Sequence, residues 1–575
     1  MAHFHIKKKK GRPYLYVREI VRVDGKPKVI SQTYIGSPDR VAELASGQDT
    51  EALHMLKVEE FGALWLAQQI DQDIDVAGII DEHIPRADRE SGPSIGEYFL
   101  YCIWNRMVEA VSKNQLAKWY QRTAIQHIRP VDLGALTSKR YWEKWDRIEE
   151  NTLRKITYAF FQRLWELESP QADCLLFDTT NYYTFMATHT PSELAHRGKN
   201  KAGRHYLRQI GLGLLVARGS QLPLYYSVYP GNLHDSRHFE AIMDEMFGIV
   251  CGLYNTRQRL TVVIDKGMNS EDNFSWIDEH SRIHFITTYS TYFAQELATV
   301  DLDHFEPVDM ERNRQLEACG QEEDRLLAYR TKGEYWGRKR TVIITYNPRT
   351  ARKQAYTLES KLETLHNELL SMRAKVKANA PQWRDPEVIK ERYIRRCHQL
   401  HISPEFYSLT FEQSKDGLKM SFRKDLYQVN RKEAMLGKNI IITDNIDWST
   451  REIVEASIDR WQVENRFRIS NNDDIVGIRP IRHWTDSKIR CHLFTCVVAM
   501  VYLRRIELKL AGHGIHRTAE DVMDDMRHLH YVLALRNKGR KPTRRMETPG
   551  KTQAEVLSAF CHRVDAGGVL QPVSA

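Results

Sequence analysis

Hydrophobic and polar positions follow two different periods in the first third of the chain. Residues 12–36, RPYLYVREIVRVDGKPKVISQTYIG, alternate about the pair Asp24-Gly25, a favoured two-residue turn. From about residue 50 to 168, apolar residues recur every three or four positions, as in NTLRKITYAFFQRLWELES, and this spacing predicts helices. We therefore expect a small antiparallel β unit with a basic arm (KKKKGR) over residues 1–45, followed by a helical domain over 46–168.

A third pattern begins at residue 169. The unbroken apolar runs CLLF (174–177) and LTVVI (260–264) are typical of strands buried on both faces, and RIHFITTYS resembles them. Between them, RQIGLGLLVARGSQLPLYYSVYPGN predicts a hairpin, and residues 236–251 predict a helix. Strands that alternate with helices in this way indicate an α/β fold, a mixed sheet flanked by helices, whose first part spans residues 169–292.

This α/β layer is interrupted and then resumed. Residues 293–436 contain short strands and a long charged helix with heptad-like Leu and Met spacing, which predicts an inserted domain with a helical hairpin. Residues 437–508 add the strand GKNIIITDN and a helix that carries Glu464, so they would complete the core. Residues 509–575 show no obvious regular pattern and are interpreted as a C-terminal tail.

Amino-acid composition excludes few classes of protein. The 575 residues include 84 Lys and Arg against 75 Asp and Glu, a formal net charge of +9, so basic residues must cluster if a polyanion is the partner. The eight cysteines form no CxxC pair, which argues for a reducing cytosol and against a structural zinc site. The longest apolar run, LFTCVVAMVYLRR, is about half the ~20 residues of a membrane span. We expect a cytoplasmic protein that has no membrane partner.

Two aspartates occupy equivalent positions in this pattern. Asp178 ends the strand CLLFD and Asp265 ends the strand TVVID, where α/β sheets place ligand and catalytic groups. Each aspartate alone is better explained as a turn or helix-cap residue. If the two strands are neighbours, however, the carboxylates converge, and such an arrangement favours a bound cation. Oxygen ligands without a Cys/His cluster indicate Mg²⁺ or Mn²⁺.

Glu464, in the stretch RWQVENRFRISN, is the strongest candidate for a third carboxylate. Arg460 and Arg468 stand four residues before and after it, so a plain surface ion pair also explains the spacing. Alternatively, the arginines bind the phosphates of a nucleic acid on which a glutamate-held metal acts. The spacing by itself leaves both interpretations open.

The order Asp178, Asp265, Glu464, with an insertion before the last, resembles the DDE transposases of bacterial insertion sequences, which have an RNase H-like core. Successive blocks resemble that family in the right order, including FDTTNYYTF, VVIDKGMNSEDNF, ITDN and ASIDRWQVENRFRISNNDDIVGIRPIRHW. The resemblance implies that the three acids are catalytic and hold two Mg²⁺ ions, for which Mn²⁺ can substitute. It also implies cleavage of double-stranded DNA at terminal inverted repeats, joining of the 3′-OH ends to target DNA, and a homodimer on DNA in the bacterial cytoplasm.

The branch it most resembles carries the signature Y-x2-R-x3-E-x6-K around the third acid. Arg460 and Glu464 fit this spacing, whereas Ser457 and Asn471 replace the tyrosine and the lysine. In the family those two side chains contact transposon-end DNA. Two alternatives therefore stay open: a catalytically impaired or domesticated DNA-binding protein, and an RNase H-like nuclease that cuts without joining. An aspartyl-phosphate phosphatase is excluded, because that chemistry needs a second aspartate where Thr180 stands.

Basic and polar residues near the acids are candidates for contacts to DNA phosphates, which dominate such interfaces. One group lies on or after the Glu464 helix and the other on the loop HRGKNKAGRHYLRQ, for which a solvated loop is an equally good explanation. The candidates are Arg460, Arg468, Asn471, Arg479, His483, Lys199, Lys201 and Arg204.

Overall fold

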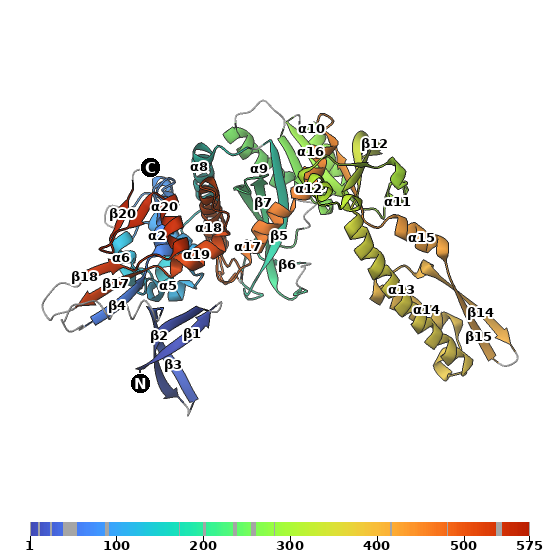
Figure 1. Ribbon diagram of the computed structural model, residues 1–575, viewed down its shortest axis with the longest axis horizontal. Coiled ribbons are helices and arrows are strands. Elements are labelled where there is room, and N and C mark those ends of the chain that lie inside the picture. The colour runs from blue at the N-terminus through green and yellow to red at the C-terminus, as the bar shows by residue number, and fades with distance from the viewer. Residues whose placement is uncertain are drawn as a thin grey trace.

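A ten-stranded mixed sheet forms the centre of the computed structural model (Figure 1). The structure describes residues 2–9, 12–23, 26–37, 55–86, 91–171, 173–198, 203–233, 239–254, 260–280, 282–414, 417–479, 481–535 and 543–573. The strand order is β11-β12-β13-β16-β10-β9-β5-β7-β6, and β8 pairs with β7. The strands are β5 (Cys174–Thr184), β6 (His196–Arg197), β7 (Arg208–Ala217), β8 (Pro223–Pro230), β9 (Leu260–Ile264), β10 (Ile283–Tyr289), β11 (Glu306–Pro307), β12 (Leu327–Tyr335), β13 (Arg338–Tyr346) and β16 (Lys438–Thr443).

The centre of this sheet is parallel and its flanks are antiparallel. β5 and β10 both run parallel to β9, whereas β7, β13 and β16 join antiparallel. The predicted runs CLLF and LTVVI are fully buried, as expected for strands covered on both faces. Helices α9 (Phe239–Tyr254), α10 (Glu271–Glu279), α16 (Thr450–Asp459) and α17 (Trp461–Ser470) pack against the sheet. The predicted fold class, a mixed α/β sheet flanked by helices and interrupted by an insertion, is confirmed.

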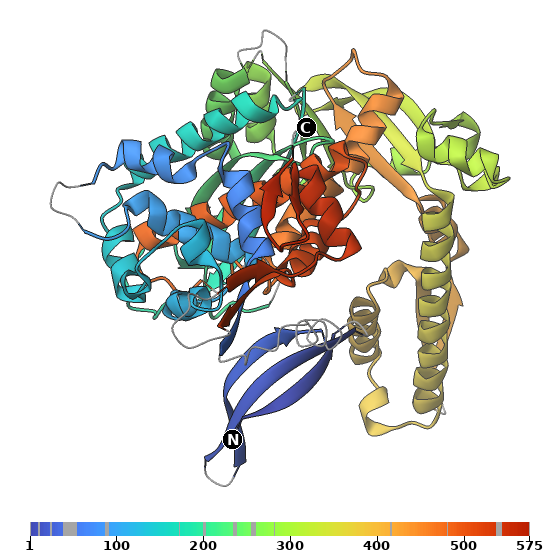
Figure 2. The same cartoon turned by 60° about the vertical axis from the view of Figure 1, so that its left-hand side comes forward.

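The inserted segment divides into two parts. The hairpin β12–β13 joins the central sheet through β16, with α11 (Gln295–Ala298) and α12 (Glu311–Ala318) beside it. The remainder forms an arm that projects from the sheet (Figures 1 and 2) and has its own apolar core, which includes Leu365, Leu369, Ile389 and Cys397. The arm consists of α13 (Pro348–Lys377), α14 (Pro386–Leu400), β14 (Tyr407–Ser414), β15 (Gly417–Lys424) and α15 (Leu426–Ala434).

A helical body packs beside the sheet. Its central helix is α18 (Asp486–Gly512), which contains the apolar run noted in the sequence and packs against α4, α8, α2 and β8. No helix in the described part of the chain is long and apolar enough to cross a membrane. The other helices are α2 (Gly62–Asp71), α3 (Val76–His83), α4 (Ile95–Val108), α5 (Lys113–Tyr120), α6 (Ile125–Ile128), α7 (Ser138–Trp145) and α8 (Glu150–Glu168).

The prediction that the C-terminal segment lacks regular structure is wrong. It forms α19 (Ala519–Arg527), β17 (His530–Leu535), β18 (Thr543–Met546), α20 (Lys551–Ala559), β19 (His562–Val564) and β20 (Leu570–Pro572). β17 pairs with β4 (Met55–Glu60), a strand from the other end of the chain, so this segment closes the helical body. These elements are short, and β4, the strand that joins them to the helical body by pairing with β17, lies hundreds of residues away, so local periodicity does not reveal them.

The N-terminal unit is a three-stranded antiparallel sheet of β1 (Ala2–Lys9), β2 (Arg12–Val23) and β3 (Lys26–Gly36). The predicted Asp24-Gly25 turn lies outside the described residues. The unit meets the helical body through aromatic contacts: the ring centroids of Tyr14 and His528 lie 4.8 Å apart, and those of Tyr34 and His530 lie 4.7 Å apart. It projects below the helical body in the view of Figure 1.

Candidate active site

The register of β5 and β9 brings the two aspartates to the same level of the sheet. The prediction that Asp178 ends its strand is wrong, because β5 continues to Thr184 and Asp178 pairs with Leu214 of β7, whereas Asp265 directly follows β9. These parallel strands pair Cys174 with Thr261 and Leu176 with Val263. Continued for two residues, the same register sets Asp178 beside Asp265 on neighbouring strands, which lie about 4.8 Å apart where they pair. The sequence-based expectation that these strands are neighbours therefore holds in the structure.

Asp265 has a structural role as well as an accessible oxygen. It caps the 3-10 turn Lys266–Met268, because its Oδ2 accepts a hydrogen bond from the backbone N–H of Gly267 at 3.2 Å. Its other oxygen, Oδ1, lies 3.1 Å from Nη1 of Arg460. A capping role and a functional role for Asp265 are thus compatible, since Oδ2 caps the turn while Oδ1 contacts the cation.

Arg460 links the second and third acids. Its Nη2 lies 2.8 Å from Oε1 of Glu464, while its Nη1 holds Asp265. Arg460 stands at the junction where α16 ends and α17 begins, and its side chain is only 23% exposed. A guanidinium therefore occupies the space between two carboxylates that come from different elements of the core, which shows that a cation fits there.

Helix α17, which carries Glu464, runs alongside β5, which carries Asp178. Near its start, Gln462 accepts a hydrogen bond from the N–H of Gly219 at 2.9 Å, in the turn beside the first residue of β5. At its end, the hydroxyls of Ser470 and Tyr182 are 2.6 Å apart. Asp178 lies between these contacts on β5, and Glu464 lies between them on α17.

The three acids do not form a closed cluster. Among the described residues, no group of three His, Cys, Asp or Glu side chains lies close enough together to hold a metal ion. Asp178 accepts a hydrogen bond from the N–H of Thr179 at 2.8 Å, and Glu464 is 51% exposed. Bringing the carboxylates onto one ion therefore needs side-chain rotation, which an exposed glutamate on a helix allows.

Of the two ion pairs that the spacing suggested for Glu464, the structure contains the one with Arg460. Arg468 instead donates to Oδ1 of Asn465, from Nε at 3.1 Å and from Nη2 at 2.8 Å. A further acid, Asp444, follows β16, where it accepts from the N–H of Phe285 and faces His284. It lies at the opposite end of the strands from Asp265, so it has a structural role.

The candidate DNA contacts differ in accessibility. Arg479 is exposed and makes no ion pair within the described part of the chain. Asn471 ends α17, where its side-chain amide donates to the carbonyl of Phe467 at 2.8 Å. The guanidinium of Arg204 lies over the Tyr183 ring, 4.8 Å from its centroid. Lys199 and Lys201 lie outside the described residues.

The position of His483 does not suit the predicted contact with a DNA phosphate. Its ring lies 5.9 Å from that of Trp145 and 5.0 Å from that of His492, inside the junction with the helical body. Burial, reinforced by nearby Lys113 and Arg106, lowers the pKa of His483 well below its usual value. The ring is therefore neutral at physiological pH, and nothing in the sequence around it indicated that α7 would cover it.

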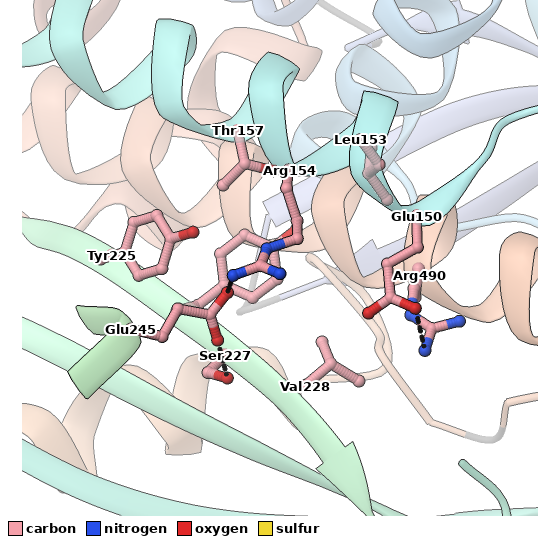
Figure 3. Close-up of a pocket in the computed structure, with 10 residues that line it drawn as sticks. Glu150, Leu153, Arg154, Thr157, Tyr225, Ser227, Val228, Glu245 and Arg490 are labelled. Carbon is pink, nitrogen blue, oxygen red and sulfur yellow. Dashed lines mark hydrogen bonds and ion pairs between the residues drawn. The ribbon is translucent and has the colours of Figure 1, made fainter. Parts of the chain in front are cut away.

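A small cavity of about 120 Å³ between α8, α9 and β8 is not part of this site (Figure 3). Its charged residues are already paired: Arg154 lies 3.3 Å from Glu245, and Arg490 lies 2.9 Å from Glu150. The hydroxyl of Ser227 donates to Glu245 at 2.9 Å. These contacts hold the helical body onto the sheet.

The fold and these acids define a class, that of α/β proteins with carboxylates at the same level of adjacent central strands. Residues 183–503 match the family model described as the transposase DDE domain, and because this match covers more than half of the chain, the chain belongs to that family. The match contains Asp265 and Glu464 and begins just after Asp178. Transposase is therefore the established class of this protein.

Two solved structures are similar to this chain. The piggyBac transposase synaptic complex with hairpin DNA has a TM-score of 0.37 and 9% identity, over 82% of each chain. The Mos1 transposase paired-end complex with left transposon end has a TM-score of 0.15 and 12% identity, over 38% of this chain and 66% of that one. No curated protein matches this chain in sequence.

Proposed function

We propose that this chain is an active transposase, which cleaves DNA at the ends of an insertion sequence and joins the 3′-OH ends to target DNA. The observation that carries this proposal is the position of Arg460, which joins Asp265 to Glu464 through one cation beside the strand that bears Asp178. This contact joins side chains from the end of β9 and from α17, next to the strand β5.

Asp178, Asp265 and Glu464 would hold the divalent metal ions that the family generally uses. Three carboxylates are the hard oxygen donors that Mg²⁺ and Mn²⁺ prefer, and the Arg460 contacts show that positive charge is accepted between two of them. Bound there, the metal would stabilise charge on the attacking and leaving oxygens of a phosphate.

The surrounding chain would hold the DNA. Arg468 on α17 and Arg479 after it are exposed, and Arg204 lies over the Tyr183 ring of β5, so these cations would contact the phosphate backbone of a bound DNA. Arg460 would turn from its carboxylates to a phosphate once metal neutralises them. Because both ends of an element must be held together, the proposed active species is at least a homodimer on DNA.

The test is cleavage of plasmid-borne ends with Mg²⁺ by purified protein. We expect Asp178→Asn, Asp265→Asn and Glu464→Gln each to lower the cleavage rate more than about 100-fold, because even residues that only support metal ligands cost 10- to 100-fold. Binding to end DNA should persist in all three. Asp272→Asn, an exposed acid on α10, is the matched control and should leave the rate unchanged.

The alternatives give different results in this assay. A nuclease would cut the plasmid but fail to join a pre-cleaved 3′-OH end to a second plasmid. Ser457 and Asn471, which replace the family's tyrosine and lysine, favour the alternative of a DNA-binding descendant of a transposase. Such a protein would retard end DNA in a gel-shift assay without cutting it in either Mg²⁺ or Mn²⁺. Either result would overturn the proposed function.

A further inference from the structure

A second concave surface lies at the far end of β5. It encloses about 570 Å³, within the range of ligand-binding pockets. Its lining comes from four places: α7, the end of β5, the segment 481–484 and the first turn of α18. The lining residues are Trp142, Phe185, Arg482, His483, Trp484 and Lys488. We refer to it as the aromatic cavity.

Backbone pairing explains why these distant segments meet. Thr184 at the end of β5 forms a parallel bridge with Ile481, and the N–H of Phe185 donates to the carbonyl of Ile481 at 3.2 Å. The hydroxyl of Thr485 donates to Asp146 at 3.0 Å, which holds the end of α7 against the start of α18. The cavity walls are therefore fixed by secondary structure and capping contacts.

Three large aromatic side chains face solvent together in this cavity. Trp484 is 65% exposed, Phe185 is 50% exposed and Trp142 is 46% exposed. Single exposed aromatics are ordinary on protein surfaces, whereas several that share one cavity indicate a binding surface. These three side chains would stabilise the fold more if they were buried in the core, so their exposure together indicates a role in binding.

Cations accompany the rings. The guanidinium of Arg482 lies over Phe185 at 5.8 Å, that of Arg204 lies over Tyr183 at 4.8 Å, and the rings of Tyr183 and Phe185 are 5.8 Å apart. Guanidinium groups and rings therefore alternate along the end of β5. Arg482 has no acidic partner among the residues that the structure describes, while Lys488 lies 3.2 Å from Asp146.

We propose that the aromatic cavity binds an unpaired nucleobase of a DNA strand, with Arg482 and Lys488 taking the adjoining phosphates. Aromatic faces beside guanidinium groups stack on unpaired bases, and each stacked base contributes substantially to binding. A continuous duplex hides its base faces, so the ligand is a single-stranded extension or a frayed end. Phe185 stands seven residues beyond Asp178, about 23 Å along an extended strand.

This inference deepens the proposed function, because it takes the DNA to be the strand that the acids cut. At 3.4 Å per base pair, 23 Å corresponds to about seven base pairs. The unpaired base would therefore lie about seven nucleotides from the cleaved phosphate. A strand held at both points would be fixed in register for the reaction.

The test uses 2-aminopurine, whose fluorescence falls when it stacks, in a duplex with a four-nucleotide single-stranded extension. With the Asp178→Asn protein, which should not cut, we expect quenching and tighter binding than to a blunt duplex of the same length. Trp484→Ala and Phe185→Ala should each weaken binding of the extended DNA about tenfold and leave the blunt duplex unaffected. Trp484→Phe should restore binding.

The control variant is Tyr356→Ala, which removes a ring that is 76% exposed on α13, far from the cavity in the sequence. It should change neither duplex. If Trp484→Ala preserves the preference for extended DNA, or if the protein shows no such preference, the proposal is overturned. Loss of self-association in Trp484→Ala, without any effect on DNA, would overturn it in favour of a second copy of the chain.

The two proposals fail separately. If quenching depends on Trp484 but the wild-type protein does not cut DNA, the nucleobase site is supported and the proposed function is refuted. Cutting and joining by Trp484→Ala at the wild-type rate, without quenching in the Asp178→Asn protein, would do the reverse.

Discussion

Replacement of Arg460 should have opposite effects on metal binding and on DNA cleavage. The Arg460 guanidinium lies 3.1 Å from Asp265 and 2.8 Å from Glu464, where a divalent ion held by the same carboxylates would place its charge. A metal must therefore displace the guanidinium before both acids can bind it. Arg460→Gln removes that competition and should tighten metal binding, while it removes a cation that the DNA phosphates need.

The size of the effect follows from exposure. Two unit charges 4 Å apart interact by about 4 kcal/mol near a protein surface and about 1 kcal/mol in water. Because Asp265 and Glu464 are 31% and 51% exposed, the lower value applies, and exposed pairs contribute about 0.2–1 kcal/mol each. Loss of two such contacts corresponds to Mn²⁺ binding that is tighter by roughly 2- to 30-fold.

Titration of Mn²⁺ into protein without DNA, with the free ion followed by electron paramagnetic resonance, measures this affinity directly. Arg468→Gln is the matched control, since Arg468 lies on the same helix and donates only to Asn465 among the described contacts. Unchanged or weaker Mn²⁺ binding by Arg460→Gln would refute the reasoning. It would show that Arg460 holds the two acids in place for the metal and does not compete with it.

Three further outcomes are expected. Burial raises the pKa of Asp71 to about 6, from 3.8, so stability should fall by about 3 kcal/mol as the pH rises from about 4 to 6, and urea denaturation of Asp71→Asn should lose this slope. Leu365→Ala should destabilise the arm by about 2–5 kcal/mol and speed amide exchange in α13 and α14 but not in β5 or β9. Asn471→Lys restores the family's lysine at the end of α17, so end DNA should bind several-fold tighter, with a salt slope steeper by about 0.9.

Local patterns predicted the parts of the fold that are locally determined. The runs CLLF and LTVVI predicted buried strands, and these became β5 and β9. The sequence placed Asp178 beside Asp265 on the condition that the two strands are neighbours, and their parallel pairing meets that condition, although β5 continues past Asp178. These predictions needed only burial and strand direction, which apolar runs encode directly.

Pairings across long separations were not predictable in this way. β4 and β17 pair although they lie near opposite ends of the chain, and β13 joins β16 across the whole arm. Whether an edge strand joins one sheet or another depends on which apolar surface remains open in three dimensions. The same limit applies to the aromatic cavity, since Trp142, Phe185 and Trp484 are far apart until Thr184 meets Ile481.

The sequence presented an ion pair and a catalytic role for Glu464 as alternatives, and the ion pair that the structure shows is compatible with the proposed role. A surface ion pair explains why Arg460 reaches Glu464, but not why the same guanidinium reaches Asp265 on another strand. That second contact requires the junction between α16 and α17 to fall beside the end of β9, so the break in the helix at Arg460 sets Glu464 near Asp265. An arginine on a solvated helix face would not need to contact Asp265 as well as Glu464. A site that holds a displaceable cation between two carboxylates does need such a position, and Arg460 occupies it.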